Sequence, residues 1–444
     1  MRYLGILDFI WVPTLLMLVL WRARKTQSDN EGNLTYTYYS KALLVKVFGG
    51  LVFALLYAFY YGGGDTINYW MDSSALSSLI FRNPICYLDV MMDNRTIQNF
   101  RCFDLTKFIP YYYFRDPQAY TVVRLTSPVY FLTINSFLGC TMIVSIIAFG
   151  GIWRLYSVFC EEYPMLYKEF AISFFFIPSV VFWGSGIMKD TYTFTAVCWF
   201  VSSVYGVLLK RRNIVSNVFY IVVASYIMIS MKAYIFVALL PGALLWTVFN
   251  QINEVENKVV RMLAAPVLIM VSIVGAALVF SQASSSLGEY GSVDSILEKA
   301  VVTQEDLKRD AYGGNTFDIG SFEPTIPGVL SKMPVAIFAG LFRPTLLDTK
   351  NIVMVISALE NTALMIFLIY VLFQVKFIGF FRYAFSKPMI LFAVIFSLFF
   401  SFAVGLTTSN FGSLVRYKIP ALPFFLASLY MIMYEWNNKS ADES

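Results

Sequence analysis

Histidine is absent from the 444-residue chain, and charged residues make up only 14% of it. The absence of histidine removes the commonest general base and the commonest transition-metal ligand from the candidate chemistry. Any acid–base role therefore falls to Asp, Glu, Lys or Tyr. Soluble proteins contain about a quarter charged residues, so the shortage of charge argues against an ordinary soluble fold.

Cysteine is scarce, and clustered positive charge is missing. The five cysteines show no metal-binding spacing, and Cys140, Cys160 and Cys198 lie in or beside apolar stretches where packing explains them. Cys86 and Cys102 share one polar loop, which permits a disulfide if that loop faces an oxidising compartment. The net charge is +5, but the basic residues stand singly at the ends of apolar stretches. We therefore expect no nucleic-acid partner.

Apolar surface is what the chain has in abundance. Apolar residues make up 58% of it and aromatic residues 18%, more than a soluble fold of this length could bury. A bilayer accepts such segments because about 20 apolar residues in a helix satisfy their own backbone. The pattern predicts an all-α, polytopic transmembrane helix bundle that forms a single integral membrane domain over residues 1–444. Hydropathy predicts about eleven spans, at 4–21, 42–61, 127–149, 170–186, 191–209, 214–231, 233–249, 262–280, 353–375, 388–408 and 419–435.

Lys and Arg in the short connections predict the orientation. They gather after the first, fifth, seventh and ninth predicted spans, and these connections fall on one side, which is therefore cytoplasmic. The first apolar segment has no cleavable small-residue site and is interrupted by Asp8, so we expect it to remain as a span. The N-terminus would lie outside and the C-terminal tail inside, in the cytoplasmic (inner) membrane of a bacterium.

Two long loops fall on the predicted outer face. Loop one covers about 62–126, and loop two covers about 281–352. Loop two contains an apolar periodicity that predicts an amphipathic helix near 293–309. It also contains the short apolar segment 332–346, which is too short and too interrupted to span. We expect that segment to lie along the membrane surface or to re-enter the membrane.

Several cations stand at outer helix ends, where the positive-inside rule gives them no role in topology. Together they suit a lipid-linked phosphate, because Arg binds phosphate through a bidentate fork and Lys binds it as a point charge. Snorkelling to the membrane surface is the alternative explanation, and it suits the lysines better than the arginines. These cations are Lys189, Lys232, Arg343, Arg416 and Lys418.

Asp65 opens loop one directly after Gly62, Gly63 and Gly64. A carboxylate facing several cations can remove a proton from an acceptor hydroxyl, which contributes roughly 10²–10⁴-fold in rate. Tyr69 follows one helical turn later and would position the substrate. In the alternative interpretation the glycines merely end a helix and Asp65 is solvated.

Two further acids are candidate substrate-binding residues. Asp190 follows Lys189 after the small residues 184–186, and it either joins the site or caps the helix that starts there. Glu360 is the acid that lies clearly inside a predicted span, so it should face the bundle interior. It would pair with Arg343 or Arg416, or it would line the site.

The loop arrangement resembles that of the GT-C membrane glycosyltransferases, which have an acid at the start of a large first outer loop and a second outer loop before the last spans. The resemblance implies that Asp65 is the catalytic base and that the donor is a polyprenyl-phosphate sugar. The chain departs from the pattern in having a single acid there and an additional helix ahead of it. The segment SGIMKDTYTF and the Arg near the final span also resemble the Wzy-type surface-polysaccharide polymerases, whose substrates are polyprenyl-diphosphate-linked glycans.

We therefore expect an integral membrane glycosyltransferase of surface-polysaccharide or glycoconjugate assembly. Its partners would be a polyprenyl-phosphate or polyprenyl-diphosphate glycan and membrane lipid. No cofactor is required, and a divalent metal is compatible with the site. The alternatives are a Wzy-type polymerase, a lipid-linked oligosaccharide flippase or other transporter, and a structural membrane partner. Transporters usually carry mid-span charges and paired repeats, whereas mid-span positions of this chain are almost free of charge and no repeat is evident.

Overall fold

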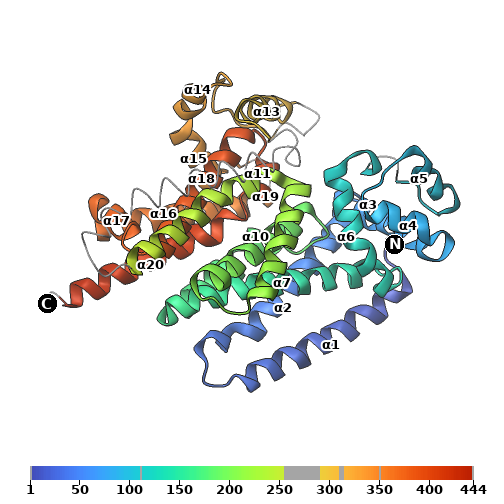
Figure 1. Cartoon of the computed structure of the whole chain (residues 1–444), viewed down its shortest axis with the longest axis horizontal. Helices are drawn as coiled ribbons and strands as arrows, with labels where there is room; N and C mark the ends of the chain where they lie inside the picture. Colours follow the sequence, from blue (N-terminus) through green and yellow to red (C-terminus); the bar gives the residue numbers. More distant parts are fainter. Residues whose placement is uncertain (1–2, 111–112, 255–290, 310–314, 350–351, 443–444) are drawn as a thin grey trace. The chain divides into compact units, whose positions relative to one another are not determined.

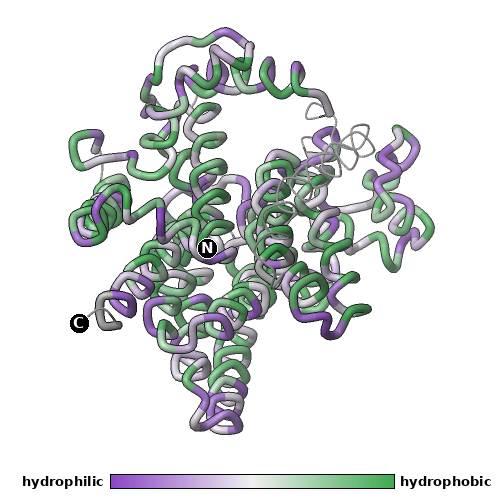
Figure 2. The backbone as a smooth tube through the Cα atoms, turned by 60° about the vertical axis from the view of Figure 1, so that its left-hand side comes forward, coloured by the Kyte–Doolittle hydropathy of each residue, from purple (hydrophilic) through white to green (hydrophobic). Residues whose placement is uncertain are grey.

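The computed structural model describes residues 3–110, 113–254, 291–309, 315–349 and 352–442. In these residues every regular element is a helix, and Thr316 and Asn410 add one isolated antiparallel bridge (Figure 1). The predicted all-α class is confirmed. Figure 2 shows hydrophobic residues running along the helices, with hydrophilic residues at many of the turns between them.

Seven helices of the described residues are long and apolar enough to cross a bilayer. An eighth span is present if α19 and α20, which meet at a bend of 59°, count together. The chain is therefore a multi-pass helical membrane protein. The candidate spans are α1 (Ile6–Asp29), α2 with flanking η1 and η2 (Leu34–Tyr60), α7 (Phe137–Glu162), α10 (Lys189–Val204) with η6 (Tyr205–Leu209), α11 (Ile214–Glu254), α16 (Ile352–Val375), α18 (Pro388–Thr407), and the pair α19 (Phe411–Tyr417) and α20 (Ala421–Asp442).

Shorter helices build the loops and the connections between spans. In loop one they are α3 (Asp65–Arg82), α4 (Pro84–Met91), α5 (Ile97–Arg101), η3 (Cys102–Leu105), η4 (Tyr113–Arg115) and α6 (Pro117–Thr133). Between α7 and α10 lie η5 (Pro164–Leu166), α8 (Tyr167–Phe175) and α9 (Pro178–Trp183). The others are α13 (Val293–Asp306), α14 (Ile326–Ser331), α15 (Met333–Phe342), η9 (Leu346–Asp348) and α17 (Phe377–Ala384).

The count of eleven spans is not shown, and two predicted spans are interrupted. The span predicted at 127–149 is broken because Ile134 and Asn135 take positive φ values of 44° and 65°; α6 ends at Thr133 and α7 begins at Phe137. The span predicted at 170–186 divides into α8 and α9, because Pro178 cannot continue the preceding helix. The span predicted at 262–280 lies outside the described residues.

The two spans predicted at 214–231 and 233–249 form one long helix, α11, with a kink at Lys232, the residue between them. Lys232 has φ −150° and ψ 73° inside α11, so the helical path is interrupted at that residue. Hydropathy alone cannot place such a break, because both sides of it are apolar. Lys232, a charged residue in an apolar stretch, was the sequence feature that indicated the break.

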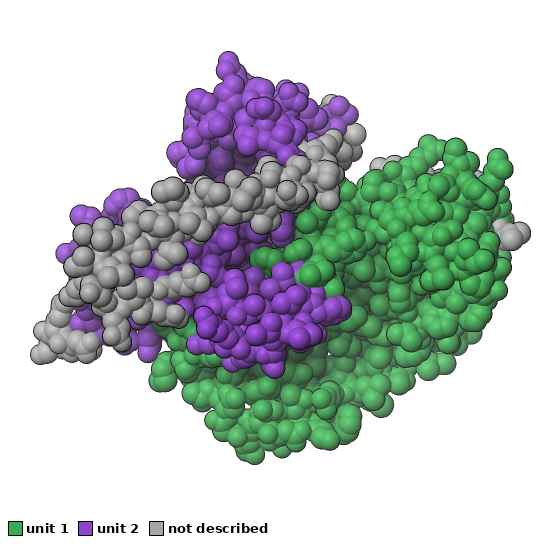
Figure 3. All heavy atoms as spheres, viewed as in Figure 1, with its two compact units in different colours: residues 1–176, 180–200, 222–232 green, residues 177–179, 201–221, 233–444 purple. Residues whose placement is uncertain are grey.

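The described chain forms two compact units, shown in Figure 3. Unit one consists of residues 1–176, 180–200 and 222–232, and unit two of residues 177–179, 201–221 and 233–444. In unit one α1, α2 and α7 pack together, and α3 packs on α6 (Figure 1). Asp8 of α1 accepts hydrogen bonds from the Ser136 hydroxyl (2.7 Å) and the Leu138 amide (2.9 Å) at the start of α7. This buried acid therefore caps a neighbouring helix.

In unit two the short helix α15 packs closely on α18. A Cβ on Gly340 would collide with the backbone of Ser401, and one on Gly405 would collide with the backbone of Ala336. Ala339 and Leu341 of α15 are buried. Of the two predicted placements for segment 332–346, this packing against a spanning helix favours re-entry. The amphipathic helix predicted near 293–309 is confirmed as α13.

The close crossing of α15 and α18 leaves no room for a methyl group at Gly340. We expect Gly340→Ala to destabilise the protein by about 1–3 kcal/mol, the usual cost of overpacking, and to lower its melting temperature in detergent. Gly150→Ala is the matched control, because a Cβ there meets no atom within 4 Å. Equal melting temperatures for the two variants would contradict the crossing.

Candidate functional site

Three glycines precede Asp65, which is the first residue of α3. Gly62 and Gly64 have φ values of 66° and 118°, a region that side chains with a Cβ rarely enter. A Cβ on Gly64 would also lie 2.9 Å from the Tyr57 ring. Asp65 therefore stands at a helix N-terminus, where the helix dipole favours a negative charge. The glycines do end a helix, as in the alternative interpretation, but Asp65 is half-buried and not fully solvated.

Tyr113 contacts the Asp65 carboxylate, and Tyr69 contacts Tyr113. The Tyr113 hydroxyl donates a hydrogen bond of 2.9 Å to Asp65 Oδ1. Tyr69 is buried and stacks on the Tyr113 ring, with 4.6 Å between centroids. Burial and the adjacent Asp65 charge raise the pKa of Tyr113, so its hydroxyl remains a donor. Tyr69 therefore contacts the ring of Tyr113, whose hydroxyl holds the carboxylate.

A second acid on α3 was missed by the sequence analysis. Asp72 follows Asp65 by seven residues, so the two lie on one helix face about 10.5 Å apart along the axis, with Asn68 and Tyr69 between them. Asp72 has no hydrogen bond or ion pair within the described residues, and burial raises its pKa to about 7. Loop one therefore offers a pair of carboxylates rather than a single acid. The seven-residue spacing in a predicted helix was the available signal.

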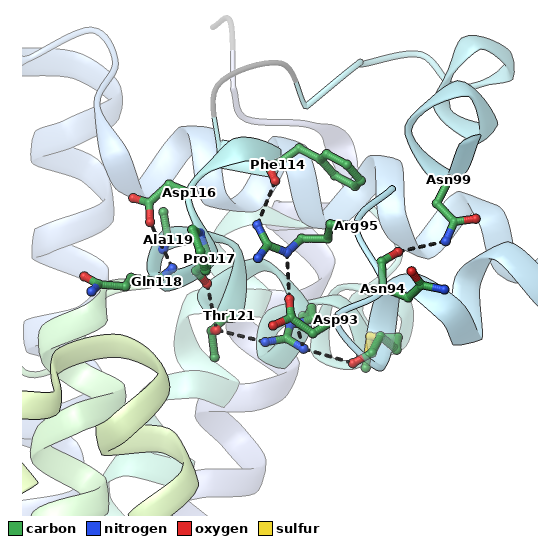
Figure 4. Close-up of polar contacts among 12 residues, drawn as sticks. Asp93, Asn94, Arg95, Asn99, Phe114, Asp116, Pro117, Gln118, Ala119 and Thr121 are labelled. Atoms are coloured by element: carbon green, nitrogen blue, oxygen red, sulfur yellow. Dashed lines mark hydrogen bonds and ion pairs between the residues drawn. The ribbon is translucent and has the colours of Figure 1, made fainter. Parts of the chain in front are cut away.

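Arg95 and Arg124 stabilise the short helix η4, to which Tyr113 belongs. Arg95 donates to the Phe114 carbonyl (2.9 Å) and to the Asp93 carboxylate (2.7 Å), as Figure 4 shows. Arg124 lies 3.5 Å from the same carboxylate and is buried. The disulfide between Cys86 and Cys102, which the sequence left open, is present and joins α4 to η3. Loop one thus holds η4, and with it the Tyr113 hydroxyl, in a fixed place.

The other end of η4 meets Lys189. Asp116 caps α6 by accepting from the Gln118 and Ala119 amides (Figure 4), and its second oxygen lies 3.5 Å from the Lys189 ammonium. Tyr113 and Asp116 are three residues apart, so their Cα atoms are within about 11 Å. The structure therefore brings Asp65, Tyr69 and Lys189 to one region of unit one.

Asp190 and Lys232 form a buried ion pair. Their charged atoms are 2.5 Å apart, and their side chains are only 2% and 9% exposed. Asp190 lies in the first turn of α10, and Lys232 lies at the kink of α11. The pair thus joins two interruptions of helical structure. Both residues belong to unit one, as do the preceding candidates.

Lys46 is a second residue that sequence reasoning missed. It lies in the middle of α2, is fully buried, and donates to the Gly184 carbonyl just after α9 ends. The break at 184–188 therefore has a cation at the C-terminal end of α9 and an anion at the start of α10. Each charge complements the dipole of its helix. A lysine inside an apolar span was the available signal.

In unit two Arg343 has a protein carboxylate as its partner. Its guanidinium binds Asp348 through two hydrogen bonds of 2.6 and 3.2 Å and lies against the rings of Phe317 and Phe411. Burial opposes ionisation of Asp348, but the hydrogen bonds from Arg343 and Thr345 outweigh it and lower the pKa of Asp348. The partner is Asp348 and not Glu360, which was one of the predicted alternatives.

The remaining candidates also belong to unit two. Lys418 is buried and donates to the Leu341 and Arg343 carbonyls (3.0 and 3.1 Å) and to Asn361 Oδ1 (2.5 Å), which occupies all three of its hydrogens. Glu360 accepts from the amide and hydroxyl of Ser179 (2.8 and 2.6 Å). Arg416 is half-buried in the last turn of α19. This geometry favours a structural role for Lys418 and Glu360, and phosphate binding by the unit-two cations stays a prediction.

Within the described residues no three His, Cys, Asp or Glu side chains gather as a metal site. Comparisons with protein-family models, with curated proteins and with solved structures find no match.

Breaking the buried pair should leave one buried charge without its ion-pair partner. We expect Lys232→Met or Asp190→Asn alone to destabilise the protein by about 3–5 kcal/mol, and the double variant to recover most of that loss. Thermal melts of the four proteins in one detergent measure the coupling. Additive losses would show that the two residues do not interact.

Asp72 should make stability depend on pH. Its pKa is about 7 in the folded chain and about 4 in an unfolded one. Its contribution is therefore fully present below about pH 4 and is lost as the pH rises through about 7. We expect the melting temperature to fall over this window, and Asp72→Asn to flatten the fall. The exposed Asp104 of the same loop supplies the control Asp104→Asn, which should keep the wild-type profile; parallel profiles for all three proteins would contradict the assignment.

Proposed function

We propose that the chain is an integral membrane glycosyltransferase that transfers a sugar from a polyprenyl phosphate at the outer face of the cytoplasmic membrane. The observation that carries the proposal is the Asp65 carboxylate, oriented by the Tyr113 hydroxyl at 2.9 Å, on a helix face that also bears Asp72. The resemblance to the GT-C glycosyltransferases supports the same assignment. Surface-polysaccharide or glycoconjugate assembly is the process that uses such donors.

In this mechanism Asp65 acts as the general base. The acceptor hydroxyl gives its proton to Asp65 as its oxygen forms a bond to the anomeric carbon. The bond from that carbon to the phosphate oxygen breaks, and the electron pair leaves with the polyprenyl phosphate. Tyr113 keeps the carboxylate oriented, and Lys189, which is 20% exposed, stabilises the leaving phosphate. A positioned base contributes roughly 10²–10⁴-fold in rate.

The disulfide supports the orientation that this function requires. Disulfides persist in oxidising compartments, so the Cys86–Cys102 bond favours loop one on the outer side. The N-terminus would then lie outside and the C-terminus inside. Termini on opposite sides require an odd number of spans, with which the proposed eleven agree.

A transporter of lipid-linked oligosaccharide is the second candidate. The observation that favours it is the buried Asp190–Lys232 pair, which joins the start of α10 to the kink of α11. Interrupted helices with charged ends are typical of transporter binding sites. A transporter would move the lipid-linked sugar without breaking its bond to phosphate.

The test compares carboxylate variants in proteoliposomes given a panel of polyprenyl-phosphate hexoses. We expect Asp65→Asn to reduce release of polyprenyl phosphate by about 10²–10⁴-fold, and Tyr113→Phe to reduce it less. Asp104→Asn, in the same loop, should keep wild-type activity.

Two other outcomes would favour the polymerase or the transporter. Full activity in Asp65→Asn would remove the carboxylate-base mechanism and favour the polymerase, whose substrate is a diphosphate. Movement of the donor across the bilayer with its sugar–phosphate bond intact would favour the transporter.

A further inference from the structure

Loop one carries an apolar surface that the proposed chemistry does not use. Helix α4 buries Cys86 and Val90 within unit one, yet its opposite face is apolar too. That face continues the end of α3, and together they form what we call the apolar stripe. Its members, from 60% exposed at Leu88 to 83% at Met92, are Phe81, Ile85, Leu88 and Met92.

The spacing makes the stripe one continuous surface. Ile85, Leu88 and Met92 are three and four residues apart, so they share one side of α4. Phe81 precedes Ile85 by four residues at the end of α3. Single exposed apolar residues are ordinary on a protein surface, but a contiguous patch marks contact with a protein or a membrane.

The stripe reaches α6, the helix that precedes a candidate membrane span. The rings of Phe81 and Phe131 lie 5.8 Å apart, which joins α3 to the last turn of α6. Leu132 and Ile134, which follow Phe131, are also exposed. The spanning helix α7 begins three residues after Ile134. The apolar surface thus extends from α4 to the point where the chain enters the bilayer.

Exposed cations flank the stripe. Arg82 lies next to Phe81, and Arg101 lies next to Cys102, which is bonded to Cys86 of α4. The nearby acid Asp93 is held by two arginines. Arginines beside an apolar helix face suit the phosphate groups of lipids, because the side-chain stem can lie on the acyl region while the head reaches the phosphate.

We propose that α4 lies on the bilayer, in the leaflet at which α7 begins, with the apolar stripe in the boundary between headgroups and acyl chains. Lipid is the occupant because the exposed apolar residues lead to the start of α7, a helix long and apolar enough to cross a membrane. Loop one would then be attached to the membrane at α4, at the C-terminal end of the helix that bears Asp65.

The test uses the full chain in nanodiscs of phosphatidylethanolamine and phosphatidylglycerol, with a nitroxide at Leu88→Cys or, separately, at Met92→Cys. Asn94→Cys is the matched control, because Asn94 is an exposed polar residue two positions from Met92 (Figure 4). The disulfide is left oxidised, and Cys140, Cys160 and Cys198 are buried, so the label goes to the introduced thiol. Power-saturation EPR then compares collision with oxygen, which concentrates in lipid, and with a polar nickel chelate.

We expect several-fold more collision with oxygen than with nickel at positions 88 and 92, and the reverse at position 94. Nickel access at 88 and 92 equal to that at 94 would place the stripe in water and overturn the proposal. Low access to both reagents would place it against protein and would overturn it equally. A short label-to-label distance between two chains would then identify a second copy as the partner.

Discussion

A helix that ends in a buried part of a protein leaves carbonyl groups that water cannot reach, and the arrangement around the buried residues 184–188 depends on meeting that requirement. Lys46 donates to the Gly184 carbonyl where α9 ends, and Lys232 pairs with Asp190 where α10 begins. Ser145 adds a hydrogen bond of 2.7 Å to the Ser185 carbonyl. Because these partners come from α2, α7 and α11, one interruption of the chain fixes how several helices of unit one pack.

The same requirement explains why charge is a poor guide to ligand binding in this chain. Lys418 was expected to bind phosphate, yet its three hydrogens meet two carbonyls and an amide oxygen. Arg343 has its own carboxylate in Asp348. Short helices and turns beside the spans leave many acceptors unpaired within their own segment, and long cationic side chains supply the donors. An anionic ligand is one explanation among others for a cation in such a place.

Much of the fold could be predicted, because spans such as α16 and α18 are long apolar runs and Lys232 marks its own kink. The break after Thr133 could not, since Ile134 and Asn135 adopt positive φ values inside an apolar stretch. At the site, the three glycines before Asp65 identified it as a candidate. That it lies in the same region as Lys189 was expected only because both were predicted to lie at the outer face. Asp72 and Lys46 each had a local signal, but the burial of Asp72 and the contact of Lys46 with Gly184 depend on tertiary packing. Contacts such as Arg343 with Asp348 depend on rotamers that periodicity does not specify.

The length of helix α15 affects the membrane topology of the chain. Its ten residues extend about 15 Å, half the thickness of the hydrocarbon core, so it cannot cross, and the chain must leave on the side from which it entered. A segment of this kind leaves the sidedness of everything downstream unchanged. Lengthening it to a full span would invert α16, α18 and α20, so its shortness is itself a determinant of topology.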